Sequence, residues 1–457
     1  MIRAPLAWDT ATGSADVTVG VVDTGVDYTH PDLAANVWTA PHAFNVTIGD
    51  ETMTCPGGAH GYNAIRGTFN PMDDNDHGTH VSGTIGAVGN NGTGVVGVNW
   101  TASIMGLKFL NSRGSGSTAD AIDAIEFAVQ AKLAGTANVR VLSNSWGGGN
   151  STLAMREEIQ RAYENDILFV CSAGNSGAGP VVNYYLPTYN VLNLLAVAAS
   201  NEDDYLAGFS NYGYWSIHLA APGVNVLSTV RKNGYASYSG TSMAVPHVSG
   251  TAALVASMWK AQTIDVTVDQ LRSLLIRSVD VDPYAVPPAD YPDERAKSIY
   301  GNVISDGRLN AYKAVTADLG TLPLFPDYVM TFTPAMQAVK RGNVAEFTLH
   351  IAPYFGYFED NLTIGLSCCH WPSITVFMQD PNTGQWVNLS TSDPKEYVHA
   401  TIGPTQGVSI PMRVQTTSKS TLSEYGITIL AKDVKEGDEA GPFLYHNDTA
   451  YLTVKKN

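Results

Sequence analysis

The alternation of short apolar segments with helical segments over about the first 320 residues restricts the fold of this 457-residue chain more than any other feature. Buried strands are indicated by four segments, ADVTVGVVDTG, VRVLSNSWGGG, ILFVCSAGN and NVLNLLAVAAS. Strands separated by helices of about ten to fifteen residues pair in parallel, with helices on both faces of the sheet. The sequence therefore predicts an α/β domain of three layers, in which functional residues collect at the carboxyl ends of the strands.

Three helical segments carry recognisable signals. TADAIDAIEFAVQAKLAG follows a Ser or Thr cap and places Ile122, Ile125, Val129 and Leu133 on one face, with Gly135 after it. SGTSMAVPHVSGTAALVASMW reads as a long helix of small residues. TVDQLRSLLIRSV opens with the Ser/Thr-x-x-Glu/Gln capping pattern, here Thr267 and Gln270.

The pattern changes at residues 318–327, which we interpret as a linker. Beyond it, alternating segments such as AEFTLHIAP, SITVFMQ and GVSIPMRVQTT have the spacing of a β-sandwich. We therefore expect an α/β domain over residues 1–320 and a C-terminal β-sandwich domain over 327–457.

Charge and composition exclude several classes of protein. A net charge of −16 argues against nucleic acid or an anionic membrane as the main partner. No apolar run reaches eighteen residues, so no membrane-spanning helix is expected. The start IRAPLAWD has neither the basic nor the apolar region of a secretory signal. The four cysteines, Cys55, Cys171, Cys368 and Cys369, are too few for a disulfide scaffold.

Asp23 ends the first predicted strand in the tripeptide Asp-Thr-Gly, which is also the presentation used by proteases with paired carboxylates. Such a pair needs two carboxylates that share one proton. The chain contains no second Asp-Thr-Gly or Asp-Ser-Gly. Asp23 must therefore have partners of another kind.

Two further glycine-flanked polar sites lie in the same domain. In DDNDHGTHVSGTIGA, His77 and His80 stand one helical turn apart, a spacing that also suits zinc. In YSGTSMAVPHVSG, Ser242 stands at a helix N-terminus, where a simple capping role is common. Taken singly, each site has an ordinary structural explanation.

Taken together, Asp23, a histidine and Ser242 favour nucleophilic catalysis. A serine hydroxyl needs an imidazole to remove its proton, and the imidazole needs a carboxylate to fix its tautomer. The helix N-terminus at Ser242 directs free N–H groups at developing negative charge. Asn175, in the loop of FVCSAGNSGAG, offers an amide as a second donor. The residues alone do not choose between His77 and His80.

The chain resembles the subtilases, the subtilisin-type serine proteases. The resemblance rests on VVDTGVDYTHPDL, HGTHVSGTIGA, SAGNSG and GTSMAVPHVSGTAAL, in the family's order over residues 1 to about 315. It implies a serine endopeptidase in which Asp23 orients the base, His77 is general base and acid, and Ser242 is the nucleophile. Asn175 and the Ser242 backbone N–H would form the oxyanion hole, and His80 would be structural. No cofactor is implied for catalysis.

The resemblance also implies where a peptide substrate binds. An extended substrate would lie between Arg113, Gly114, Ser115 and Gly116 on one side and Ser145, Trp146 and Gly147 on the other. The side chain before the scissile bond would enter between residues 145–148 and a second segment that includes Ser172, Gly174 and Asn175. Tyr185 would lie at the bottom of that pocket.

Other family features are expected by the same resemblance. GNNGTGVVGV resembles a structural calcium loop, with Asp32, Asn91, Thr93 and Val95 as ligands. The matching mature start at APLAWD implies a processed, secreted enzyme whose signal and inhibitory prodomain lie outside this chain. Asp76 stands where the family commonly has Gly, and we expect its carboxylate to raise the pKa of His77.

Seven Asn-x-Ser/Thr sequons are consistent with a secreted glycoprotein. They begin at Asn45, Asn91, Asn99, Asn150, Asn361, Asn388 and Asn447.

Two alternatives remain at this stage. Proprotein convertases also carry a β-rich domain after the protease domain, although their histidine and serine motifs differ from those found here. A catalytically inactive scaffold would use the β-domain to bind a partner.

Overall fold

The computed structural model describes residues 2–149, 151–179, 186–214, 216–281, 286–320, 324, 327–354, 360–366, 373–390, 397–402, 407–433 and 445–456. The chain forms two compact units. Unit 1 comprises residues 1–187 and 191–324, and unit 2 comprises 188–190 and 325–457.

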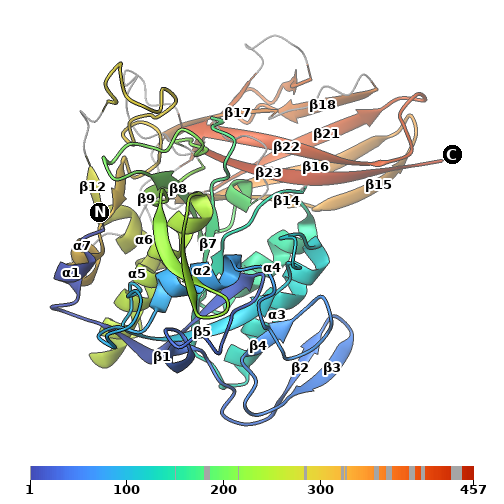
Figure 1. Ribbon diagram of the computed structural model, residues 1–457. Coiled ribbons are helices and arrows are strands. Elements are labelled where there is room, and N and C mark those ends of the chain that lie inside the picture. Colours follow the sequence, from blue (N-terminus) through green and yellow to red (C-terminus); the bar gives the residue numbers. More distant parts are fainter. Residues whose placement is uncertain are drawn as a thin grey trace. The chain divides into compact units, whose positions relative to one another are not determined.

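Unit 1 is built on a nine-stranded sheet in the order β12-β13-β9-β8-β7-β6-β1-β5-β4 (Figure 1). All neighbours pair in parallel except β12 and β13, which are antiparallel. The strands are β1 (Gly13–Asp23), β4 (Gly61–Asn63), β5 (Thr101–Lys108), β6 (Val139–Asn144), β7 (Leu168–Ser172), β8 (Leu194–Ser200), β9 (Leu219–Pro222), β12 (Val279–Val281) and β13 (Gly307–Leu309). The predicted mostly parallel sheet is confirmed.

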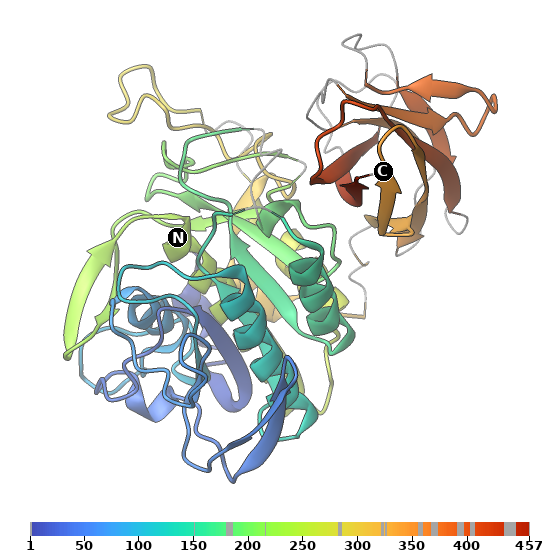
Figure 2. The ribbon, with the colours of Figure 1, turned by 90° about the vertical axis from the view of Figure 1, so that its right-hand side faces the viewer.

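Helices cover both faces of this sheet. The helix α5 (Thr241–Ala261) packs with α2 (His77–Gly86), and α3 (Thr118–Leu133) packs with α4 (Leu153–Glu164), as Figure 2 shows for the latter pair. The remaining helical segments are α1 (Ala4–Ala7), α6 (Val268–Arg277), α7 (Ala311–Thr316), η1 (Ala34–Asn36) and η2 (Leu186–Thr188). Two hairpins lie outside the sheet, β2 (Phe44–Ile48) with β3 (Glu51–Cys55), and β10 (Val226–Val230) with β11 (Gly234–Tyr238).

The predicted capping signals form as expected. Ser117 and Asp120 make a reciprocal capping box at the start of α3, and Gly135 beyond its end has φ of 69°. Thr267 and Gln270 make the same box at α6.

The predicted apolar face of α3 is partly wrong. Leu133, at the last helical position, is 61% exposed, whereas Phe127 is fully buried. The reason is an aromatic cluster that the helical spacing does not reveal. The ring of Phe127 stacks on Tyr62 of β4 with centroids 5.3 Å apart, and Phe44 of β2 lies 6.1 Å away. Side chains of β2 and β4 thus bury a side of α3 that the helical spacing does not predict.

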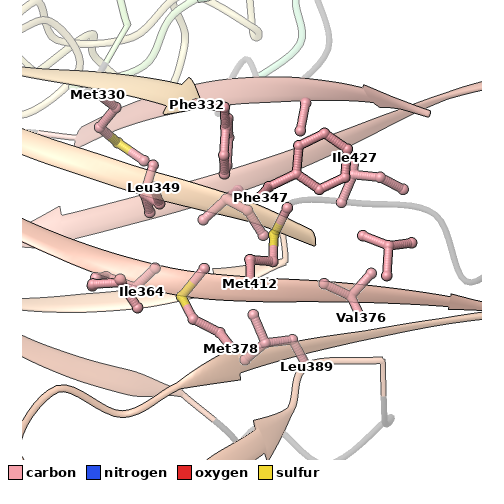
Figure 3. Packing of buried hydrophobic residues seen from close by; sticks show 14 of the residues in the cluster. Met330, Phe332, Phe347, Leu349, Ile364, Val376, Met378, Leu389, Met412 and Ile427 are labelled. Atoms are coloured by element: carbon pink, nitrogen blue, oxygen red, sulfur yellow. The ribbon is translucent and has the colours of Figure 1, made fainter. Parts of the chain in front are cut away.

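Unit 2 consists of two five-stranded sheets, in the orders β14-β16-β21-β18-β19 and β15-β23-β22-β17-β20. Their bounds are β14 (Asp327–Thr333), β15 (Met336–Lys340), β16 (Val344–Tyr354), β17 (Asp360–Leu366), β18 (Ile374–Gln379), β19 (Trp386–Asn388), β20 (Val398–Ile402), β21 (Val408–Thr416), β22 (Glu424–Asp433) and β23 (Tyr445–Lys455). Buried residues of both sheets, among them Phe347, Met412, Ile364 and Ile427, share one core (Figure 3). This arrangement confirms the predicted β-sandwich.

Candidate active site

Asp23 lies at the end of the strand on either side of which the later strands of the sheet are added. β1 lies between β5 and β6, so the strands that follow it in sequence are added on opposite sides. In open parallel sheets this switch point leaves a crevice at the carboxyl ends of the strands. Asp23 is the last residue of β1 and is fully buried.

His77 meets Asp23 at this edge. Its Nδ1 lies 2.8 Å from Asp23 Oδ1 and 2.9 Å from Oδ2, so Nδ1–H donates to the carboxylate. The backbone approach depends on Gly78, because a Cβ there would lie 2.1 Å from the carbonyl oxygen of Gly25. The N–H of Gly78 donates to Thr24 Oγ1 at 2.9 Å, which fixes the start of α2 against the end of β1.

The pKa of His77 is raised above its ordinary value of 6.5. Burial of the imidazole lowers the pKa, but the charge and hydrogen bond of Asp23 outweigh it, with a further contribution from Asp73. The side chain of His77 is 27% exposed, so the opposite edge of the ring remains accessible.

The residue before His77, Asp76, forms an ion pair with Arg231. Arg231 donates to it from Nε at 2.8 Å, from Nη2 at 3.3 Å and from its backbone N–H at 3.1 Å. Asp76 adopts φ of 113°, a conformation that favours glycine. The carboxylate that adds to Asp23 in raising the pKa of His77 is therefore Asp73, rather than Asp76 as the sequence suggested.

Ser242 is the second residue of α5 and exchanges hydrogen bonds with Ser145. Ser242 Oγ donates to the Ser145 carbonyl at 3.0 Å, and Ser145 Oγ donates to the Ser242 carbonyl at 2.8 Å. Among the described residues, no hydrogen bond joins Ser242 to His77. Ser145 also lines a cavity to which His77 contributes.

Asn175 has one end of its amide fixed. Its Oδ1 accepts from the Thr241 backbone N–H at 2.9 Å and from Thr241 Oγ1 at 3.0 Å. The Nδ2 end is thereby directed away from Thr241 and is left to donate. A Cβ on Gly240 would lie 3.7 Å from Asn175 Nδ2 and from the Ser242 backbone nitrogen, and 3.9 Å from Asn175 Oδ1, so the Asn175 amide lies beside the start of α5.

Sequence reasoning missed Thr241. This fully buried residue also accepts the Gly174 N–H at 3.2 Å through Oγ1, and so it positions both Asn175 and the loop before it. The only signal was its place beside the candidate nucleophile.

A cavity of about 630 Å³ lies beside His77. It is lined by Thr24, Asn75, His77, Phe109, Leu110, Arg113, Gly114, Ser115, Gly116, Ser117, Thr118, Ser145, Trp146, Gly147, Gly148 and Gly149. All seven residues predicted on the two sides of the substrate are among them. Ser172 and Gly174 are not. Ser172 Oγ instead donates to the Trp146 carbonyl at 3.0 Å and supports the wall from behind.

His80 has different partners from His77. Its Nε2 lies 3.0 Å from the carbonyl oxygens of Val226 and Ala236, and its ring stacks on Tyr238 with centroids 4.4 Å apart. Burial lowers the pKa of His80 to about 4. The two histidines therefore do not converge on one ligand, and the described residues include no group of three or more His, Cys, Asp or Glu placed to hold a metal ion.

The four residues predicted as calcium ligands lie close together and are joined by hydrogen bonds. Asp32 Oδ1 accepts from Asn91 Nδ2 at 2.6 Å, and Oδ2 accepts from the Val95 N–H at 3.0 Å and from the Tyr235 hydroxyl at 3.3 Å. Asn91 Oδ1 accepts the Thr93 N–H at 2.9 Å. Calcium needs six to eight oxygens directed at one point. In this arrangement the side-chain oxygens of Asp32 and Asn91 accept hydrogen bonds from the protein, and calcium binding by these residues stays a prediction.

The sequons differ in accessibility. Asn45 is exposed, whereas Asn99 is 1% exposed and donates from Nδ2 to the carbonyls of Ile85 and Gly250. Because a glycan is attached through Nδ2, Asn99 is unsuited to carry one in the folded chain. Asn388 is half-buried. Asn150 and the side chains of Asn361 and Asn447 lie outside the described residues, as do Tyr185, Cys368 and Cys369.

The two described cysteines, Cys55 and Cys171, are free and buried. The described helices include none long and apolar enough to cross a membrane.

The fold and this site define a parallel α/β protein with a buried Asp–His pair at the switch point of its sheet. A family model described as the subtilase family matches residues 14–303. The chain belongs to the subtilase family.

Three curated relatives illustrate the similarity. A thermophilic serine proteinase of Bacillus sp. (strain AK1) is 34% identical over 315 residues, which are 68% of this chain and 64% of that protein. Thermitase of Thermoactinomyces vulgaris is 33% identical over 314 residues, which are 69% of this chain and 93% of thermitase. Subtilisin Savinase of Lederbergia lenta is 37% identical over 254 residues, 56% of this chain and 81% of that protein. The chain thus spans slightly less than two thirds of the first relative.

Proposed function

We propose that this subtilase is a serine endopeptidase that cleaves peptide bonds through Asp23, His77 and Ser242. The observation that carries the proposal is the 2.8 Å hydrogen bond between His77 Nδ1 and the buried Asp23 carboxylate. It keeps the proton on Nδ1, which leaves Nε2 as the basic atom of the exposed ring edge.

In the proposed reaction, His77 Nε2 takes the proton of Ser242 as Oγ bonds to the scissile carbonyl carbon. The C–N bond then breaks while His77 returns the proton to the leaving amine, which leaves an ester on Ser242. Water attacks this ester with His77 again as base, and the acid product and free Ser242 are released. Asp23 accepts the hydrogen bond from His77 Nδ1 and stabilises the imidazolium in both steps.

Negative charge on the carbonyl oxygen would be met by Asn175 Nδ2 and the Ser242 N–H. Both groups lie near Gly240, and the N–H and hydroxyl of Thr241 hold the amide through its Oδ1. Donors fixed before the reaction cost no reorganisation when charge develops.

The Ser242 hydroxyl must turn from the Ser145 carbonyl toward His77. Hydrogen bonds of a catalytic base are often absent or long before substrate binds. A substrate strand between residues 113–116 and 145–147 would bring its carbonyl carbon to the point where Oγ attacks.

The test compares Ser242→Ala and Asn175→Ala with the unaltered enzyme on a peptide library, read by mass spectrometry. In a subtilisin, loss of the nucleophile costs on the order of 10⁶-fold and loss of the Asn donor about 10²- to 10³-fold. We expect no detectable cleavage by Ser242→Ala and weak residual cleavage by Asn175→Ala.

Ser237→Ala is the matched control, because this exposed serine lies in β11, shortly before Ser242. It should cleave like the unaltered chain. A fluorophosphonate probe should label Ser242 in the folded protein. Equal cleavage with and without Ser242, or folded protein that takes up no probe, would overturn the proposal; the latter would favour a binding scaffold.

We also infer, from the family alone, a secreted enzyme released from a prodomain. The exposed sequon at Asn45 is consistent with the secretory pathway.

A further inference from the structure

The described residues that line the cavity beside His77 include no carboxylate. Of its sixteen lining residues, only His77 and Arg113 have side chains that can carry charge near neutral pH. Arg113 is exposed, and the ion pairs formed among the described residues do not include it. In a chain with a net charge of −16, Arg113 thus places one positive charge in the lining of this groove, and no carboxylate of the described residues lines it.

The turn that carries Arg113 is fixed by its own hydrogen bonds. Asn111 Oδ1 accepts the N–H of Arg113 at 2.9 Å and that of Ser115 at 3.3 Å, and the Asn111 N–H donates to the Ser115 carbonyl at 2.9 Å. Gly114 at its tip has φ of 71°, which a side chain would disfavour.

Asn75 joins this turn to the base. Its Nδ2 donates to the Ser112 carbonyl at 3.0 Å, while its Oδ1 accepts the His77 N–H at 3.2 Å. Two hydrogen bonds thus set the position of the turn relative to His77. The backbone of Arg113 is placed by the fold, and only its side chain is left to adjust.

The carboxylates around His77 bind other residues of the chain. Asp23 binds His77, Asp74 pairs with Lys108 and Asp76 pairs with Arg231. Asp73 accepts the N–H groups of Asn75, Asp76 and Thr79 and the Thr79 hydroxyl. Asp120, next to the cavity, binds Ser117 in the capping box. None of these carboxylates forms an ion pair with Arg113 among the described residues.

We propose that Arg113 makes this groove favour peptides with Asp or Glu among the three residues before the scissile bond. The inference rests on the proposed function, because it assigns a substrate class to the same site. Arg113 and His77 line one cavity, so a carboxylate that pairs with Arg113 belongs to a residue near the bond that is cut. A guanidinium binds a carboxylate through paired N–H donors, which the neutral amide of Gln or Asn does not match.

The expected preference is modest because Arg113 is exposed to solvent. Pairing at exposed sites changes rates or affinities by a small factor. We expect kcat/KM for a Glu peptide to exceed that for its Gln counterpart by about two- to fivefold at low salt. The ratio should fall toward one as salt is raised to about 0.5 M, where the screening length is only a few ångströms.

The experiment measures kcat/KM for matched peptides with Glu, Gln or Lys at each of the three positions. The enzymes are the unaltered chain, Arg113→Gln and Arg113→Glu, with Arg66→Glu as control. Arg66 is exposed and is not a lining residue, and the control changes the net charge by the same amount as Arg113→Glu. We expect a preference for Glu over Gln at one position, its loss in Arg113→Gln, and a preference for Lys in Arg113→Glu. Arg66→Glu should leave the ratio unchanged.

Cleavage of all three peptides at equal rates would overturn this inference and leave the proposed function standing. A preference of the unaltered enzyme for Lys, as in proteases that cut at paired basic sites, would also overturn it. Absence of Ser242-dependent cleavage of any peptide would instead remove the proposed function. If the Arg113 variants fail to fold, the Glu-to-Gln ratio of the unaltered chain and its salt dependence decide the question.

Discussion

At the scale of single residues, His77 is the group whose environment most affects the proposed reaction. Burial disfavours its charged form, whereas Asp23 and Asp73 favour it, and the net result is a raised pKa. A base must be neutral to accept a proton. The fraction of competent enzyme therefore increases as pH rises through the raised pKa.

We predict that kcat/KM rises with pH with a midpoint above about 6.5, the ordinary value for histidine. Asp23→Asn removes the charge that raises the pKa, so the midpoint should move to lower pH. The rate should fall by about 10⁴-fold, as for the equivalent change in another serine protease. Rates between pH 5 and 9 test both expectations.

Asp16→Asn is the control, because Asp16 is an exposed residue of the same strand. It should leave the midpoint unchanged. A midpoint that stays in place when Asp23 loses its charge would show that this carboxylate does not set the pKa of His77.

The residues differ in how far sequence could place them. Asp23 was predictable, because a polar residue that ends a buried strand of a parallel sheet lies at the functional edge. The choice of His77 over His80 required the family motif. The structure supplies the physical reason, since His80 is enclosed by the carbonyls of Val226 and Ala236. The pairing of Asp76 with Arg231 joins residues 155 positions apart, which no local pattern indicates.

At the scale of elements, the hairpin of β10 and β11 is attached to α2 through His80. Nε2 donates toward two carbonyls of the hairpin, while Nδ1 is buried and has no partner among the described residues. Ser228 Oγ, also in the hairpin, donates to the His80 carbonyl at 2.7 Å. The hydrogen bonds to the carbonyls favour the charged imidazole, but burial of the ring outweighs them, lowers its pKa and favours the neutral form.

We predict that stability falls as pH falls below about 6.5 and continues to fall toward 4, the lowered pKa of folded His80. The unfolded chain takes up a proton in this range before the folded chain does, so acid favours unfolding. The loss from this residue is on the order of 3 kcal/mol. Denaturant unfolding between pH 7.5 and 4.5 measures it, with Ser242→Ala as the parent to prevent self-cleavage.

His80→Gln should be less stable at neutral pH but should lose less stability on acidification. His42→Gln, at an exposed position, should retain the slope of the parent. Parallel slopes for the parent and His80→Gln would contradict the role assigned to this ring.

Element boundaries were predictable where local chemistry fixes them. The predicted Ser or Thr cap of α3 is Ser117, and the predicted capping box of α6 formed between residues three apart. The burial of Phe127 was not predictable from helical spacing, because its partners come from residues 44 and 62, which are distant in sequence.

At the scale of the whole molecule, each unit has its own core. The core of unit 2 draws buried residues from both of its sheets, and Phe347 within it is 2% exposed (Figure 3). A unit with a separate core can unfold as a separate cooperative transition.

We predict that Phe347→Ala destabilises unit 2 by about 3 to 5 kcal/mol. Calorimetry in the Ser242→Ala background should show one of two transitions move to lower temperature. Peptidase activity of the otherwise unaltered chain should stay the same at temperatures below that transition. Val344→Ala, at a 41% exposed position of the same strand, should move neither transition. A single transition that shifts as a whole would contradict independent unfolding.

The position of β1 between β5 and β6 affects when the candidate site forms during folding. The three candidate catalytic residues stand at positions 23, 77 and 242, and contacts between such distant segments form late because closing long loops is slow. In a partly folded chain the carboxylate, the imidazole and the hydroxyl are therefore not yet close together. On the proposed function, peptidase activity would therefore appear only after the sheet that brings these three residues together has formed.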